Sequence, residues 1–155
     1  MRTGPTVGLR SPPVTRGGID GVSRFFGLRW ESADVVRMTI RPDLINAAGL
    51  LSGAATYALV DYCMGSALWR ETTEEEAIAT ISIAINYVAT ATEGDVICRT
   101  TLDRRNRRLA VLRSEVTAEE REDPGRAGGF GESRLLATAI GSYTIFPRRK
   151  IQPEG

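Results

Sequence analysis

The chain has 155 residues, a length that fits one domain with a sizeable core. Hydrophobic residues make up 42% and charged residues 25%, and the net charge of +1 gives no global indication of binding to nucleic acid or to an anionic membrane. The chain contains no histidine, which excludes Ser-His and Cys-His catalysis and any metal site that needs imidazole.

The N-terminal region is predicted to lie outside the folded domain. Residues 1–19 contain three prolines and four glycines, a composition typical of a flexible arm. No apolar run precedes a small-residue cleavage site there, so no signal peptide is visible and a cytoplasmic location is expected. We therefore expect one domain over residues 20–147 and a tail over residues 148–155.

The domain is predicted to begin with a short helical turn over residues 19–26. Apolar and polar residues then alternate over residues 27–40, with a break at 32–34. This period of two favours a pair of short strands in a hairpin. Pro42 ends the second strand because proline interrupts a strand ladder, and a loop is expected to follow it.

The stretch over residues 46–70 is the most distinctive part of the chain, since Asp61 is its only charged residue before Arg70. Ser52 is a candidate N-cap, which predicts a helix from Gly53 to about residue 70. The helix is apolar nearly all round, as is typical of a helix inside a core. A bilayer-spanning helix is disfavoured because a central Asp61 would cost roughly 3 kcal/mol there. A carboxylate on such a helix must be hydrogen-bonded or functional.

The chain after this helix is predicted to form strands. Their ranges are 80–87, 96–102, 109–118 and 132–146, separated by a turn at 93–95, a polar corner at 103–108 and a polar loop at 119–131. The corner is expected to be a hairpin turn with Asn106 in the left-handed conformation. Cys63 and Cys98 form no motif and are expected to be small core residues.

The order of two strands, one long helix and four strands predicts an α+β fold. Short connections between consecutive strands imply an antiparallel sheet. A helix that is apolar nearly all round cannot bury its whole surface on one flat sheet, so either the sheet wraps around it or a second copy covers it. A curved sheet around a central helix, in a dimer, meets both demands.

Several residues of the helix region carry a resemblance to a known family. Asn46 and Gly49 precede Ser52-Gly53-Ala54, and Asp61 follows Gly53 by eight positions. The next strand, ATISIAINYVATATEGD, is Thr-rich and ends in a turn, and the last strand reads ATAIGSYTIFPRR. Together with the element order, these segments resemble the hotdog fold, and specifically the PaaI-type acyl-CoA thioesterases. Ser52 stands where the family has a histidine, and Ala54 stands at its second glycine.

The resemblance implies hydrolysis of acyl-CoA thioesters. Gly53 at the helix N-terminus offers a backbone N–H that can polarise a thioester carbonyl, and Asp61 can act as general base or nucleophile. Ser52 and Ala54 are expected beside the substrate. Thr80 is a candidate for holding the attacking water, and Asn46 for orienting the helix start or the carbonyl. No cofactor is expected, because coenzyme A is part of the substrate.

The spacing of Gly53 and Asp61 predicts an assembly of more than one copy. Eight residues of one helix span about 12 Å, so one carbonyl cannot contact both groups of the same chain. The two can meet only if Asp61 comes from a second subunit, which predicts a homodimer or a dimer of dimers. Arg105, Arg107 and Arg108 are candidates for binding the coenzyme A phosphates, since arginine binds phosphate bidentately.

Other interpretations remain open at this stage. Asp61 could be a structural carboxylate held by backbone groups or tyrosine hydroxyls, and the arginines could be a solvated hairpin turn. The protein could bind acyl-CoA or an acyl carrier without catalysis, as the missing family histidine suggests. A hotdog hydratase is disfavoured, because that chemistry usually pairs an acid with histidine. No basic face with interleaved aromatics indicates nucleic-acid binding.

Overall fold

The computed structural model describes residues 19–119 and 133–149. The elements within them are α1 (Gly21–Phe26), β1 (Arg29–Ser32), β2 (Val35–Thr39), the 3-10 turn η1 (Pro42–Leu44), α2 (Gly53–Arg70), β3 (Glu76–Tyr87), β4 (Asp95–Arg105), β5 (Leu109–Ala118) and β6 (Arg134–Pro147). This order confirms the predicted sequence of elements. The predicted arm over 1–19, the loop over 119–131 and the tail over 148–155 lie almost entirely outside the described residues.

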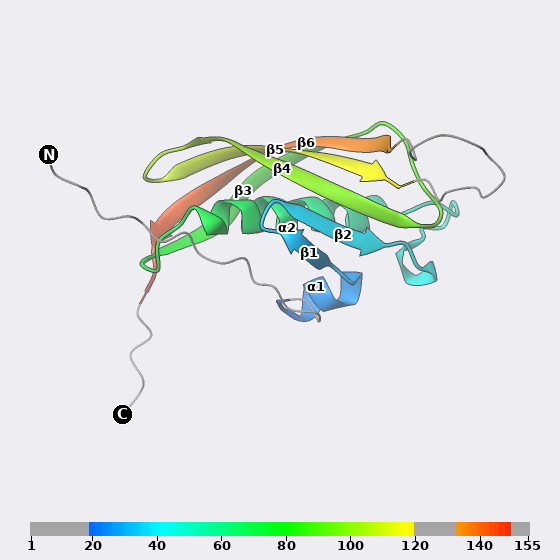
Figure 1. Cartoon of the computed structure of the whole chain (residues 1–155), viewed down its shortest axis with the longest axis horizontal. Helices are drawn as coiled ribbons and strands as arrows, with labels where there is room; N and C mark the ends of the chain where they lie inside the picture. The colour runs from blue at the N-terminus through cyan, green and yellow to red at the C-terminus, as the bar shows by residue number, and fades with distance from the viewer. Residues whose placement is uncertain (1–18, 120–132, 150–155) are drawn as a thin grey trace, which may run out of the picture.

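One antiparallel sheet contains every strand of the described residues, in the order β1-β2-β4-β5-β6-β3. The sheet curves around α2, which lies lengthwise against its inner face (Figure 1). This arrangement confirms the predicted α+β hotdog fold. β3 lies at one end of the strand order, so one of its edges has no partner strand within the described part of the chain.

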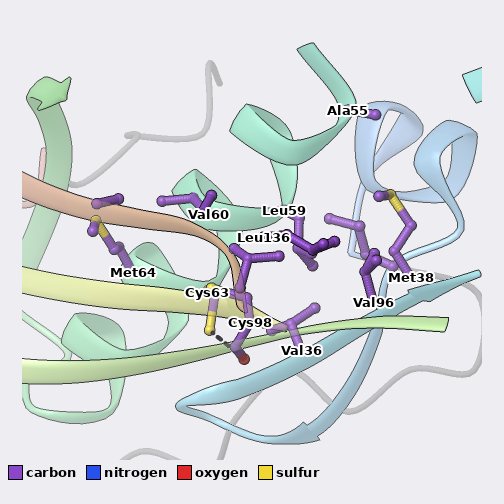
Figure 2. Packing of buried hydrophobic residues seen from close by; sticks show 14 of the residues in the cluster. Val36, Met38, Ala55, Leu59, Val60, Cys63, Met64, Val96, Cys98 and Leu136 are labelled. Carbon is purple, nitrogen blue, oxygen red and sulfur yellow. Dashed lines mark hydrogen bonds between the residues drawn. The ribbon is translucent and has the colours of Figure 1, made fainter. Parts of the chain in front are cut away.

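The core forms where α2 meets the inner face of the sheet. Leu59, Val60 and Met64 of α2 are fully buried, as are Val36 and Met38 of β2. Figure 2 shows these side chains gathered between helix and strands. Burying each large apolar side chain contributes about 1.5–3 kcal/mol, so this contact holds α2 firmly in place.

The two cysteines belong to the same core, as predicted. Both are free thiols and both are buried. The Cys63 Sγ donates a hydrogen bond to the Cys98 backbone carbonyl at 3.4 Å, the dashed contact in Figure 2. Burial raises the pKa of the Cys63 thiol, which keeps it protonated and unreactive.

A glycine of β6 allows α2 to approach the sheet closely. A Cβ built on Gly141 would lie 2.6 Å from the Met64 Sδ and 3.3 Å from Ile83 Cγ1. Real Cβ atoms do not approach other atoms that closely, so an alanine here would require the Met64 side chain, or the helix that carries it, to move. Tyr143 lies two residues further along β6 and Asp61 one helical turn before Met64, so this close contact is a neighbour of the contact between Tyr143 and Asp61.

Helix α1 is attached to α2 through Asp20. The Asp20 side chain caps α1 by accepting a hydrogen bond from the Ser23 backbone N–H at 2.8 Å, and the Tyr62 hydroxyl donates to the same carboxylate at 2.8 Å. Burial acts to raise the pKa of Asp20, but these hydrogen bonds outweigh it and hold the pKa below the ordinary value of 3.8. The sequence indicated only a helical turn here and did not reveal its contact with α2.

Two details of the strand predictions need correction. β3 begins at Glu76, four residues before the predicted start, because the preceding residues pair with the C-terminal part of β6. β4 continues to Arg105, so the polar corner is shorter than predicted. The left-handed Asn106 is wrong, since no described residue other than glycine has a positive φ. Its side-chain oxygen instead closes the turn by accepting hydrogen bonds from the Arg108 and Leu109 N–H groups at 2.9 and 2.8 Å.

Candidate functional site

The start of α2 forms the first part of the candidate site. Ser52 is the N-cap, as predicted, and its hydroxyl accepts a hydrogen bond from the Ala54 N–H at 3.2 Å. Gly53 is the first helical residue, and its N–H has no acceptor among the described residues. The N–H therefore stays available at the positive end of an 18-residue helix.

Asn46 organises the loop that leads into this helix. Its side-chain oxygen accepts hydrogen bonds from the Ala48 and Leu50 N–H groups at 2.9 and 3.2 Å. The backbone N–H of Asn46 also bonds to the Leu50 carbonyl at 2.8 Å. Asn46 thus holds together the loop that leads into α2.

A small pocket opens beside the helix start. Its volume is about 210 Å³, and Asn46, Leu50, Gly53, Thr56, Tyr87 and Leu136 are among the residues that line it. Tyr87, the last residue of β3, donates a hydrogen bond from its hydroxyl to the Gly53 carbonyl at 2.9 Å. A Cβ on Gly53 would lie only 3.3 Å from the Tyr87 ring, so a side chain there would crowd the tyrosine.

Asp61 forms the second part of the candidate site. It lies half-buried on α2, and two hydroxyls donate to the same carboxylate oxygen, Oδ1. Thr80 of β3 donates at 2.8 Å and Tyr143 of β6 donates at 2.6 Å. The costly carboxylate on an apolar helix is thus satisfied by neutral donors from two neighbouring strands.

Tyr143 is the most deeply buried of these groups, with 2% of its surface exposed. Burial and the adjacent Asp61 carboxylate raise the pKa of the Tyr143 hydroxyl well above its ordinary value of 10. Sequence reasoning missed Tyr143 because it lies 82 residues from Asp61 along the chain. The one available signal was a polar aromatic on the inward face of the last strand, a position otherwise expected to be apolar.

The arginines of the β4–β5 turn lie at a different place from Asp61. Arg105 forms an ion pair with Glu76 at 2.6 Å. Arg107 and Arg108 line an open groove of about 1040 Å³. Because Glu76 and Thr80 are four residues apart on β3, this groove begins about 13 Å from the Asp61 contact. Arg107 and Arg108 form no ion pair with any described residue.

The structure therefore brings some predicted residues together and separates others. Thr80 lies beside Asp61, whereas Asn46, Ser52 and Gly53 lie together at the start of α2. Within one chain these two groups are at different levels of the helix, as their spacing required. Ala54 is exposed next to Gly53.

The described residues contain no group of three or more acidic, histidine or cysteine side chains that could hold a metal ion. None of the helices within residues 19–119 and 133–149 combines the length and apolar character needed to span a bilayer.

A curved antiparallel sheet around one long helix, with an acidic residue on that helix and an open N–H at its start, defines a hotdog-fold protein. The family model of the Thioesterase superfamily matches residues 48–124, a span that includes Gly53, Asp61 and Thr80. The chain is similar to this superfamily over that span. No curated protein matches it in sequence.

Solved structures share the fold at low sequence identity. A conserved protein from Pseudomonas aeruginosa is 24% identical with a TM-score of 0.69, and the match covers 86% of this chain and 100% of that one. A thioesterase from Haemophilus influenzae is 16% identical with a TM-score of 0.71, covering 83% and 85%. A protein from Bacillus halodurans, determined with CoA, is 18% identical with a TM-score of 0.66, covering 81% and 75%.

Proposed function

We propose that this protein hydrolyses acyl-CoA thioesters at a site shared between two copies of the chain. The Gly53 N–H of one copy polarises the thioester carbonyl, and Asp61 of the other copy acts as general base. The observation that carries the proposal is the open Gly53 N–H at the start of the helix that also holds Asp61. The similarity of residues 48–124 to the Thioesterase superfamily supports this assignment of chemistry.

The free edge of β3 supports the shared site. This strand is 12 residues long, and Glu76 is its only charged residue. A long apolar edge of this kind favours pairing with another strand, and a two-fold dimer would supply one. β3 is also the strand that touches both halves of the site, through Thr80 beside Asp61 and Tyr87 beside Gly53.

An antiparallel pair of β3 edges would bring the two half-sites together. If Thr80 of one copy lies near the level of Tyr87 in the other, Asp61 approaches Gly53 of the second copy. Residues that oppose each other across an antiparallel pair face the same side of the sheet. The two-fold axis would then pass close to Ile83 or Ala84.

The proposed reaction is the hydrolysis of the thioester C–S bond. Asp61 takes a proton from water as the water oxygen bonds to the carbonyl carbon, and the Gly53 N–H stabilises the negative charge on the carbonyl oxygen. The C–S bond then breaks, and the departing thiolate of coenzyme A recovers the proton from Asp61. Such an N–H donor is worth about 3 kcal/mol in comparable acyl-transfer sites. A thiolate leaves readily, so a strong general acid is not required.

The groove beside Arg107 and Arg108 fits the coenzyme A part of this substrate. Its two arginines have no described ion-pair partner, so they are available for phosphate. The groove is separated from Asp61 along β3, as expected when the pantetheine arm lies between phosphates and thioester. The Bacillus halodurans structure determined with CoA is consistent with a related ligand here. Arg105 is the weaker candidate because Glu76 already neutralises it.

A non-catalytic acyl-CoA or acyl-carrier binding protein is the second candidate. The observation that favours it is Ser52, which stands where the resembling family has histidine and uses its hydroxyl to cap α2. In this alternative the carbonyl still binds at Gly53, but no water is activated.

The deciding experiment measures thiol release from a panel of acyl-CoAs by the wild type, Asp61→Asn and a matched control, Asp103→Asn. We expect the wild type and the control to hydrolyse at least one acyl-CoA and Asp61→Asn to lose at least about a hundredfold in kcat. If the wild type hydrolyses none of the acyl-CoAs but its Tm rises when acyl-CoA is added, the result supports the non-catalytic binding protein instead. Full activity in Asp61→Asn contradicts the assignment of Asp61.

The shared site has its own test. Ala84→Cys should form a disulfide between two copies under oxidising conditions, because opposed residues of paired strands lie within disulfide range. Thr101→Cys, on β4 away from the free edge, serves as the control and should not cross-link. A protein that is strictly monomeric by light scattering at assay concentration would rule out the shared site.

A further inference from the structure

The two oxygens of the Asp61 carboxylate have different surroundings. Thr80 and Tyr143 both donate to Oδ1, at 2.8 and 2.6 Å. Oδ2 has no hydrogen-bond partner among the described residues. An isolated carboxylate has two equivalent oxygens that exchange by rotation, and two donors on one of them remove that equivalence.

Tyr143 is better suited than Thr80 to hold Oδ1 in place. Its ring is buried at the contact of β6 with α2, so the hydroxyl has little freedom to move. The same hydroxyl lies 3.0 Å from the Asp61 backbone carbonyl oxygen, so the phenol contacts both the backbone and the side chain of Asp61. Burial also raises the pKa of this hydroxyl, so it remains a neutral donor across the working pH range.

We propose that Tyr143 is a positioning residue, which together with Thr80 holds Oδ1 so that Oδ2 is the oxygen that accepts the proton from water. This inference rests on the proposed thioesterase function and assigns a role to a residue outside the helix motif. It also changes the role of Thr80, which orients the base rather than the water.

The main test compares Tyr143→Phe with Tyr62→Phe. The second variant is a matched control because it also removes a tyrosine hydroxyl bonded to a carboxylate, that of Asp20. We expect Tyr143→Phe to lower kcat about tenfold or more with KM nearly unchanged. Tyr62→Phe should leave both unchanged. If Tyr143→Phe lowers Tm but leaves kcat as in wild type, Tyr143 is only structural and the proposal is wrong.

Thr80 variants separate the hydroxyl from the side-chain shape. Thr80→Val removes the donor at nearly constant volume and should lower kcat with KM nearly unchanged, as in Tyr143→Phe. Thr80→Ser keeps the donor and should retain more of kcat than Thr80→Val. Equal kinetics for both Thr80 variants would contradict a role for the second donor.

A readout that does not need activity separates this proposal from the thioesterase assignment. In protein labelled with ¹³C at aspartate carboxyls, the Asp61 signal is identified by its loss in Asp61→Asn. Its chemical shift at a fixed pH should change in Tyr143→Phe, which removes a hydrogen bond to Oδ1, and stay in place in Tyr62→Phe. Failure of every acyl-CoA to react, with this change present, would reject the thioesterase function but retain the positioning contact. An unchanged Asp61 chemical shift in Tyr143→Phe rejects the positioning role.

Discussion

The close approach of α2 to β6 at Gly141 can be tested by adding a single methyl group. Gly141→Ala would place a Cβ 2.6 Å from the Met64 Sδ and 3.3 Å from Ile83 Cγ1. Overpacking of this kind costs about 1–3 kcal/mol. Replacing glycine with alanine also reduces the conformational entropy of the unfolded chain, which offsets about 0.4–1 kcal/mol of this loss in stability. We expect a net loss of roughly 1–2 kcal/mol, or about 2–8 °C in Tm for a chain of this length.

The assay is urea unfolding followed by far-UV circular dichroism at fixed protomer concentration, since association would alter the apparent stability. Gly65→Ala is the control, because nothing lies within 4 Å of its added Cβ and alanine is the better helix former. It should raise the free energy of unfolding by about 0.5–1 kcal/mol. A Gly141→Ala protein as stable as wild type would refute the close-contact argument.

A double-mutant cycle tests whether Met64 is the residue that an alanine at position 141 collides with. Met64→Ala alone should cost about 2–5 kcal/mol because it empties a buried position. In the Gly141→Ala background the same change should cost less, by about 1 kcal/mol, since it also removes the collision. Additive effects would mean that Met64 is not what Gly141 accommodates.

Three further predictions concern pH, the groove and the thiols. Asp20 has a lowered pKa in the folded chain, so it stabilises the fold above its ordinary value of 3.8 and loses that contribution as pH falls through the folded value. The Tm of Asp20→Asn should therefore fall less than the Tm of the wild type between about pH 6 and about pH 3, and equal falls in the two proteins would contradict this role of Asp20. Replacing both Arg107 and Arg108 with Gln should raise KM for acyl-CoA about tenfold. The same change should leave kcat within about twofold and Tm within about 1 °C of the wild-type values. An unchanged KM would mean that the phosphates of coenzyme A bind elsewhere. The two buried cysteines should react with a thiol reagent only on unfolding, and rapid labelling of the native protein would contradict their burial.

Much of the fold followed from local patterns. The apolar stretch from Ser52 to Arg70 predicted a helix with the observed cap and end, because helix signals depend on residues within one or two turns. The alternation in β5 predicted its bounds correctly. The start of β3 was missed because its first residues lack a clear alternation and are held by pairing with the distant β6.

The candidate site was only partly visible in the sequence. The free N–H of Gly53 and the isolated carboxylate of Asp61 could be predicted, because each depends on position within one helix. Asn46 and Ser52 also lie close before that helix in the chain, so both could be predicted from the local rules for helix starts. The turn at Asn106 shows the limit of such logic, since its side chain closed the turn without the left-handed backbone that was predicted.

The sequence by itself determined the order of elements, the helix with its open start and the distance that separates Gly53 from Asp61. These follow from periodicity, capping and helix rise, which act between neighbours along the chain. Only the tertiary structure decided that Tyr143 and Thr80 hold one oxygen of Asp61 and that Met64 of α2 packs closely against Gly141 of β6. Those contacts join strands and helix that are far apart in sequence, and a one-residue change in strand register would turn each side chain to the opposite face.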